Sequence, residues 1–473
     1  MIRRPLALAL ALVLLPSLAS AEDLLQTYEL ARQGDPQLSA AESSRFVSRE
    51  GVVQARALRL PQLSGEVSGN YSRTDGGSGG GRTEIDPITG QPIIVSSDGT
   101  TENRSLSAGV NGRQMLFDRS VGTRVRSQDA LSRAGDFRLE SANDSLVTRT
   151  SQAYFNVLVQ IETLAGAQVA EAAFQKQFDF ADKRLEVGLA PITDVYEARA
   201  RYDQARANTI LVRTALQDAY QALAEITGQP IADLKGLPED FVPALPASDG
   251  VESWVRTAVE TNPGLRAKQL QLESSEADIA TARAGHLPTV YLTGGLNDRR
   301  SQTDASGRSF DNDSRGPSIG VTLNVPIFTG GATSSRVRQA LAQRDVVTDE
   351  LEQQKRGLER STRNAYQTLV AGITEVEARK NALFSARSAY DASQVGLEVG
   401  TRTVLDVLNN QQTLFEAQRL YAQSRYNYLQ NRLLLEQAAG TLDIDDVQEV
   451  NRLLTVDADA QLVNPAQATP PRR

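Results

Sequence analysis

The sequence predicts a mainly α-helical fold with a membrane β-barrel, built from two tandem structural repeats. Three observations predict this fold class. One turn motif occurs twice, a seven-residue apolar repeat follows each copy, and two pairs of alternating segments interrupt the helical patterns. We expect long coiled-coil helices that form an α-barrel, together with four β-strands in each chain.

The repeated turn motif occupies residues 400–406 (GTRTVLD) and, 212 residues earlier, residues 188–194 (GLAPITD). Each glycine follows a long stretch without proline, which is typical of a helix C-terminus because glycine adopts positive φ without steric cost. The hydroxyl groups of Thr193, Thr401 and Thr403 are candidates to cap the helix that follows. The motif therefore predicts two long helical hairpins.

Each predicted turn precedes a helix with a heptad repeat. A second row of smaller residues runs beside the first in both copies, and a sustained heptad indicates closely packed, supercoiled helices. An ordinary amphipathic core helix is the alternative, but duplication of the whole register favours the coiled coil. The main row consists of Val195, Tyr202, Thr209, Leu216 and Leu223 in the first copy and Val407, Leu414, Tyr421, Tyr428 and Leu435 in the second.

The N-terminus predicts an exported protein. Residues 1–21 contain Arg3 and Arg4, a short apolar run and Ala19-Ser20-Ala21, which together are typical of a secretory signal peptide. The apolar run is shorter than the roughly 20 residues that a membrane-spanning helix needs, and no later stretch approaches that length. The chain has no cysteine, which excludes disulfides, thiolate sites and a lipid anchor on cysteine.

Charge and composition exclude several functions. Loss of Arg3 and Arg4 with the signal peptide changes the formal net charge from -8 to -10, so the chain lacks the basic footprint of nucleic-acid binding. Its single histidine, His286, leaves no histidine triad or His-rich metal site. Residues 311–316 resemble the start of a calcium loop, but Thr322 replaces the final glutamate, which favours a solvated loop. We therefore predict no enzyme, no cofactor and no metal ion.

Two repeats are expected after the signal peptide. The first spans residues 22–233, with an initial helix, strands at about 62–72 and 104–117, and long helices at about 119–187 and 192–227. A proline-containing linker follows at 234–249. The second repeat spans 250–442, with strands at about 289–297 and 318–328 and long helices at about 332–399 and 403–439. A partly disordered tail is expected at 443–473.

Alternating strands of this length in an exported chain indicate a transmembrane barrel. Four strands cannot close a barrel, and open sheet edges are not tolerated in hydrocarbon, so several chains must pool their strands. The long helices would extend this barrel as a tube with the two turns at its far tip. A symmetric ring of Asp406 carboxylates there would attract cations, and the alternative is that Asp406 complements a helix dipole.

The chain resembles the TolC family of outer-membrane channel-tunnels over nearly all of its mature length. The resemblance lies in residues 286–289 (HLPT), 326–331 (PIFTGG), 187–195 (VGLAPITDV), 399–408 (VGTRTVLDVL) and 422–429 (AQSRYNYL). It implies a homotrimer with a 12-stranded barrel in outer-membrane lipid and a periplasmic α-barrel whose entrance is closed by coiled helices. It also implies export of small molecules (efflux) or proteins (type I secretion), with a periplasmic adaptor and an inner-membrane ABC or proton-driven transporter as partners.

The same resemblance assigns roles at the entrance. Asp406 matches the constriction aspartate, and Thr193, Asp194 and Arg402 match residues that link the closed entrance. Asn409 stands where the family has a second constriction aspartate, and Leu397 stands where it has a gate tyrosine. The alternatives are a passive oligomeric outer-membrane porin and a periplasmic structural coiled-coil protein.

Overall fold

The computed structural model describes residues 23–77, 82–86, 88–95, 98–238, 240–244, 250–305 and 308–458. The predicted signal peptide lies outside these residues. The chain forms two compact units: unit 1 comprises Met1–Arg45, Ala134–Gln269 and Glu350–Arg473, and unit 2 comprises Phe46–Arg133 and Leu270–Asp349. Each unit therefore contains segments from both halves of the chain, unlike the two predicted repeats.

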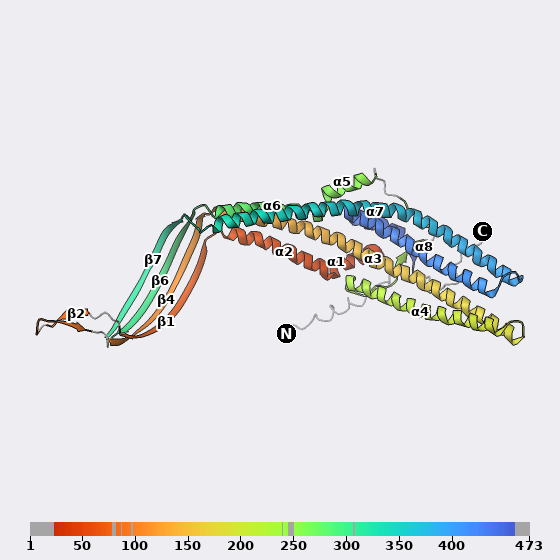
Figure 1. Cartoon of the computed structure of the whole chain (residues 1–473), viewed down its shortest axis with the longest axis horizontal. Coiled ribbons are helices and arrows are strands. Elements are labelled where there is room, and N and C mark those ends of the chain that lie inside the picture. Colours follow the sequence, from red (N-terminus) through yellow and green to blue (C-terminus); the bar gives the residue numbers. More distant parts are fainter. Residues whose placement is uncertain are drawn as a thin grey trace, which may run out of the picture. The chain divides into compact units, whose positions relative to one another are not determined.

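The helices of the two halves match in length (Figure 1). Helices α1 and α5 have 11 residues, α2 and α6 have 22, α3 and α7 have 68 and 67, and α4 and α8 have 36. None of the helices in the described ranges is both long and apolar enough to cross a membrane. Their bounds are α1 Leu24–Gly34, α2 Pro36–Ala57, α3 Arg119–Glu186, α4 Ile192–Thr227, α5 Val251–Thr261, α6 Pro263–Ala284, α7 Ala332–Glu398, α8 Val404–Ala439 and α9 Ile444–Leu453.

The main heptad row is the buried face of α4 and α8. All five of its members in α8 are buried, and in α4 only Tyr202 is half-buried while the other four are buried. The predicted packing of this row is therefore confirmed. In unit 1 the second half of each row joins one continuous core with side chains of α1, α3 and α9, which includes the fully buried Tyr154, Leu158 and Leu429. Nearer the turns, Val195 belongs to a separate small cluster with Ala181 and Ala198.

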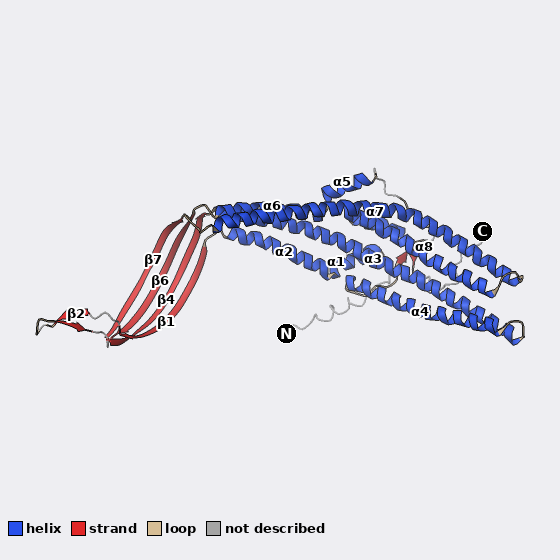
Figure 2. Ribbon diagram, viewed as in Figure 1, coloured by secondary structure: helices blue, strands red, loops and turns tan. Residues whose placement is uncertain are grey.

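Unit 2 contains a four-stranded antiparallel sheet in the order β1-β4-β6-β7 (Figure 2). Its strands are β1 Gln62–Gly77, β4 Asp98–Phe117, β6 Thr289–Ala305 and β7 Arg308–Asn324. A separate hairpin, β2 Arg82–Ile85 and β3 Pro92–Val95, lies between β1 and β4 in the chain.

One face of this sheet is apolar and exposed. The strand register places Val110 opposite Leu296, and both of these side chains are more than half exposed. The opposite face is polar, with Ser68 and Ser107 joined by a hydroxyl contact of 2.8 Å. A contiguous exposed apolar face of this kind is typical of contact with lipid or another protein. Its members include Leu63, Val67, Leu106, Val110, Leu296, Ile319, Val321 and Leu323.

The strands differ from the prediction at their outer ends. Residues 73–77 and 98–103 extend β1 and β4, and residues 298–305 and 308–315 extend β6 and β7, so strand replaces the expected loop there and residues 311–316 lie within β7. Cross-strand ion pairs replace apolar contacts there: Arg73 lies 3.5 Å from Glu102, and Arg315 lies 4.0 Å from Asp298. β7 ends at Asn324 and not near residue 328, consistent with Pro326, which has no N–H for a ladder.

The predicted linker and tail are packed segments. Lys235–Gly236 (β5) pairs with Val456–Asp457 (β8), so these two parts of the chain form a small sheet together. Several of their apolar side chains are buried and cover the core of unit 1, whereas Val242 is 74% exposed. The buried residues are Leu234, Leu237 and Phe241 in the linker and Val447, Val450 and Leu454 in the tail. The prediction of disorder is wrong for residues 444–457, and residues 459–473 lie outside the described chain.

Helix α9 also holds the start of the described chain. The Asn451 side chain accepts a hydrogen bond from the Leu24 N–H at 3.0 Å and donates one to Asp23 at 3.0 Å. The residues joined in this way are 427 and 428 positions apart in the sequence.

Candidate functional site: the helical hairpin turns

Two tight turns join α3 to α4 and α7 to α8, and both lie at the same end of unit 1 (Figure 2). Gly188 and Gly400 have φ of 73° and 77°, values that a side chain would strain. The Thr401 N–H donates to the Gly396 carbonyl at 2.8 Å, and the Leu189 N–H donates to the Arg184 carbonyl at 2.8 Å. These bonds satisfy carbonyls that the end of each long helix leaves open.

Asp406 forms a capping box with Thr403 at the start of α8. Its carboxylate accepts hydrogen bonds from the Thr403 N–H at 3.0 Å and from the Thr403 hydroxyl at 2.9 Å. These bonds, with that from the backbone N–H contributing most, lower the pKa of Asp406 below its ordinary value. Asp406 therefore stays ionised in mildly acidic solution, and it also lies where an acid favours the helix dipole.

The cap predicted for α4 is wrong. Pro191 occupies the N-cap position without a side-chain bond, and Thr193 lies one residue inside the helix. Proline has no side-chain acceptor for the first N–H groups of the helix, and the Asp194 N–H donates instead to the Pro191 carbonyl at 3.2 Å. The Thr193 hydroxyl lies 3.5 Å from the Asp194 carboxylate, and both residues face solvent at least in part.

The Asn409 side chain contacts Arg201, a residue that no sequence motif marks. The guanidinium of Arg201, on α4, donates to the Gln412 side-chain oxygen at 3.1 Å and to the Asn409 side-chain oxygen at 3.4 Å. Asn409 lies three residues after Asp406 on α8, so the two side chains are neighbours on the helix surface. The Arg201 contact joins residues 208 and 211 positions apart, and no local pattern signals it.

Arg402 and Leu397 lie around the α7–α8 turn. The Arg402 N–H donates to the Gly396 carbonyl at 3.0 Å, and a Cβ on Gly396 would lie 2.6 Å from Arg402 Cγ. The Leu397 carbonyl accepts from the Gly400 N–H at 3.2 Å, and its side chain is half-buried. Across the described chain, no hydrogen bond joins Thr193 or Asp194 to Arg402, so within one chain these predicted link residues stay in separate turns.

Apolar side chains project from both turns. The exposed fraction is 66% for Val187, 68% for Leu189 and 53% for Ile192 at the first turn, and 68% for Val399 at the second. Exposed aliphatic residues therefore flank both glycine turns, and we call these four residues the tip surface. Exposed apolar side chains at the end of a helical hairpin suit a protein contact.

A buried ion pair fixes α8 to α3 away from the tip. The Arg425 guanidinium donates to the Glu162 carboxylate at 2.7 Å and to the Pro238 carbonyl at 3.0 Å. The Tyr426 hydroxyl donates to the second Glu162 oxygen at 2.8 Å. The side chains of Arg425 and Glu162 are only 5% and 15% exposed, so this network also secures the packed segment around Pro238.

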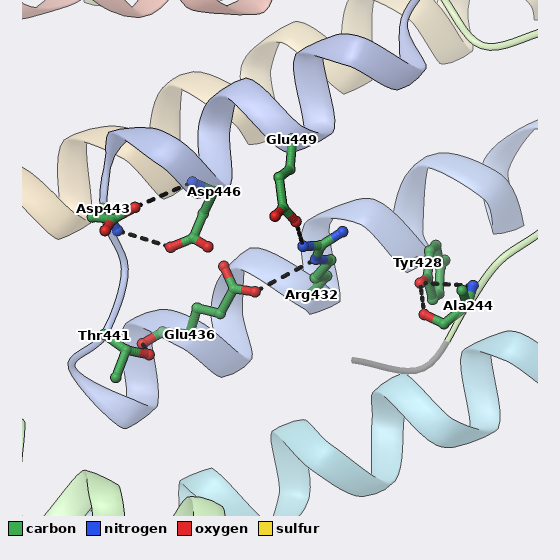
Figure 3. Close-up of polar contacts among 8 residues, drawn as sticks. All are labelled: Ala244, Tyr428, Arg432, Glu436, Thr441, Asp443, Asp446 and Glu449. Carbon is green, nitrogen blue, oxygen red and sulfur yellow. Dashed lines mark hydrogen bonds and ion pairs between the residues drawn. The ribbon is translucent and has the colours of Figure 1, made fainter. Parts of the chain in front are cut away.

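A second polar cluster joins α8 to α9 (Figure 3). Arg432 pairs with Glu436 at 3.4 Å and with Glu449 on α9. Burial, together with the nearby Asp446, raises the pKa of Glu436 to about 8, and burial also raises the pKa of Asp446. Glu436 is therefore mostly protonated at neutral pH, which removes the repulsion between the two acids.

Long helices that end in a tip surface, together with a sheet that exposes an apolar face, define the class of envelope channel proteins. The family model for the outer membrane efflux protein matches residues 27–229 and 254–441. The chain therefore belongs to the outer membrane efflux protein family.

Relatives and solved structures agree with this family. The chain is 32% identical over 452 residues to the outer membrane protein TolC of Vibrio cholerae serotype O1, covering 96% of this chain and 98% of that protein. It is 27% identical to the proteases secretion protein PrtF of Dickeya chrysanthemi, covering 95% and 94%. It has the fold of the CusC channel, with a TM-score of 0.70 at 20% identity over 88% of this chain and 92% of that one.

The protein is an outer-membrane channel for efflux or secretion, with its helical tunnel in the periplasm. This confirms the predicted family, fold class, location and function. The alternative of a periplasmic structural coiled-coil protein is wrong. The family is one of transport proteins and not of enzymes.

Proposed function

We propose that three copies of the chain form the channel, with their sheets joined into one barrel of 12 strands. The sheet order carries this proposal: among the described strands, β1 and β7 each have a neighbour on one side only. Open edges of this length are not tolerated in hydrocarbon, and an apolar outward face suits lipid. Pairing of β7 with β1 of the next copy removes both edges.

The hairpin turns form the closed entrance of this trimer. Asp406 is the constriction carboxylate, and within one chain its hydrogen bonds to Thr403 favour the ionised form by lowering its pKa. Asn409 adds no charge, so the ring has half the charge of one with two aspartates. Thr193, Asp194 and Arg402 then link neighbouring copies, and Leu397 contributes packing at the entrance but no hydroxyl.

The tip surface docks a periplasmic adaptor, because its exposed aliphatic side chains suit a protein contact. An inner-membrane ABC or proton-driven transporter supplies the energy. The relatives support both efflux and secretion, since one is named as a protease secretion protein and another, BepC of Brucella suis, as an outer membrane efflux protein. Cargo selection belongs to the transporter, and the exported cargo comprises small molecules or proteins.

The test is single-channel recording of the purified protein in planar bilayers, with the mass of the detergent-solubilised oligomer. We expect a trimer with a small, cation-selective conductance that rises in Arg402→Ser. Trivalent cations should block the channel, Asp406→Ala should abolish the block, and Asn409→Asp should tighten it. A monomer without conductance, or a block that survives Asp406→Ala, would contradict the proposal.

A further inference from the structure

The guanidinium of Arg201 contacts the side chain of Asn409, which lies beside Asp406 on α8. Its two terminal nitrogens each donate to a neutral amide oxygen of α8, that of Gln412 at 3.1 Å and that of Asn409 at 3.4 Å. A guanidinium that donates through both nitrogens is oriented by its planar fork and stays charged at any physiological pH. The contact therefore fixes both the position and the charge of this group.

The charge of Arg201 is not neutralised by a carboxylate. None of the ion pairs formed within the described chain includes Arg201, whose two partners are uncharged amides. Arg199, two residues earlier on the same helix, differs in this respect, because it pairs with Asp203 on its own helix at 3.8 Å. Arg201 therefore adds a full positive charge to the face of α8 that carries Asp406 and Asn409.

We propose that Arg201 is a selectivity-determining and positioning residue of the entrance. Its guanidinium holds α4 against α8, and its charge offsets that of Asp406, so the entrance discriminates less between cations and anions. The proposal rests on the assignment of Asp406 to the constriction. In a trimer, three arginines would stand beside three aspartates, which replaces a purely acidic ring by one of mixed charge.

Three variants separate the charge of Arg201 from its contacts. Arg201→Gln removes the charge, and Arg201→Lys keeps the charge but cannot donate to Asn409 and Gln412 through a planar guanidinium. Arg199→Gln is the matched control, because it removes an arginine of the same helix that is paired with Asp203. In planar bilayers, Arg201→Gln should raise the cation-to-anion permeability ratio on the order of fivefold, because a unit positive charge beside Asn409 is removed. Arg201→Lys should keep the parent's ratio but raise the closed-state conductance, and Arg199→Gln should match the parent in both.

A fourth variant tests the assignment on which the proposal rests. Asp406→Asn should lower cation selectivity, whatever Arg201 does. If Asp406→Asn lowers selectivity and Arg201→Gln changes nothing, the inference about Arg201 is wrong and the constriction stands. If Asp406→Asn also changes nothing, the constriction assignment fails, and the role of Arg201 fails with it.

A double-mutant cycle tests the direct contact. In the parent, a carboxylate introduced by Asn409→Asp would pair with Arg201, so block by hexaamminecobalt(III) should tighten only slightly. In the Arg201→Gln background the same substitution should tighten the block several-fold more. Additive effects of the two substitutions would show that Arg201 and Asn409 do not interact at the entrance.

Discussion

Thr403 and Asp406 form reciprocal hydrogen bonds across the first turn of α8. The hydroxyl of Thr403 contacts the carboxylate of Asp406 at 2.9 Å and accepts from its backbone N–H at 3.2 Å. The same carboxylate that begins the helix is therefore the one that we place at the constriction, and its ionisation is coupled to the shape of the turn.

This coupling predicts a pH dependence of cation block. Because the pKa of Asp406 is lowered, block should persist as the pH falls to the ordinary range of an aspartate and disappear only below it. Thr403→Val removes the hydroxyl bond to Asp406 but keeps the backbone N–H bond, which lowers the pKa of Asp406 most. The pH at which block is lost should therefore rise only partway towards that of an ordinary aspartate. Thr401→Val is the control, since its hydroxyl donates to Gly396 and not to Asp406. A titration that is identical in both variants would contradict the coupling.

Gly396 should control the position of Arg402. In Gly396→Ala the new methyl group would lie 2.6 Å from Arg402 Cγ, so the arginine must move. We expect a raised closed-state conductance like that of Arg402→Ser, with little further increase in the double variant. Gly372→Ala on the same helix has open space around it, so it should leave conductance unchanged and stabilise α7 by up to about 1 kcal/mol. Equal conductance in Gly396→Ala and the parent would contradict this role.

The buried pair of Arg425 and Glu162 should dominate the stability of its region. Arg425→Met leaves a buried carboxylate without its cation, which costs about 3–5 kcal/mol. Arg419→Met on the same helix removes an exposed pair with Glu416, which is worth about 0–1 kcal/mol. Urea unfolding of the two variants gives the comparison. Similar urea midpoints would show that the Arg425 side chain, which is 5% exposed, contributes no more to stability than a surface residue.

The stability of unit 1 should fall as pH rises from about 5 to 8. The folded-state pKa of Glu436 is raised to about 8, so the folded chain binds a proton that the unfolded chain has already lost, and stability decreases through that range. Glu436→Gln should flatten the dependence by a few kcal/mol. Asp144, whose pKa is raised by burial to about 7, leaves a residual slope of the same sign. Urea midpoints at pH 5 and pH 8 measure the effect, and an unchanged slope in Glu436→Gln would contradict it.

Local patterns predicted the helices and their turns well. The heptad row and the glycines at 188 and 400 each depend on neighbours close in sequence, so their burial and positive φ could be expected. The outer halves of the strands could not, because charged residues occur there on both faces, such as the consecutive Arg299 and Arg300 of β6, and leave no alternation of apolar and polar positions. Burial of the linker and tail depends on pairing between Lys235 and Asp457, which no local pattern reports.

The site was predicted only in part. The positions of Asp406, Asn409 and Arg402 near the second turn follow from the motif, but the capping partner of Asp406 depends on which hydroxyl the backbone presents. The symmetry of the two motifs suggested a hydroxyl cap in both, and Pro191 removes it from the first. Arg201 reaches Asn409 because two helices pack together, and such a contact needs the tertiary structure.

The hydrogen bonds of Asn451 to Asp23 and Leu24 join the two ends of the described chain, so they constrain when this part of unit 1 can fold. An exported polypeptide emerges with its N-terminus first, yet the start of α1 is secured only when a residue more than 400 positions later arrives. Until then α1 covers a core from which α9 is missing. The contacts between the start of α1 and α9 can therefore form only after residue 451 has crossed the inner membrane.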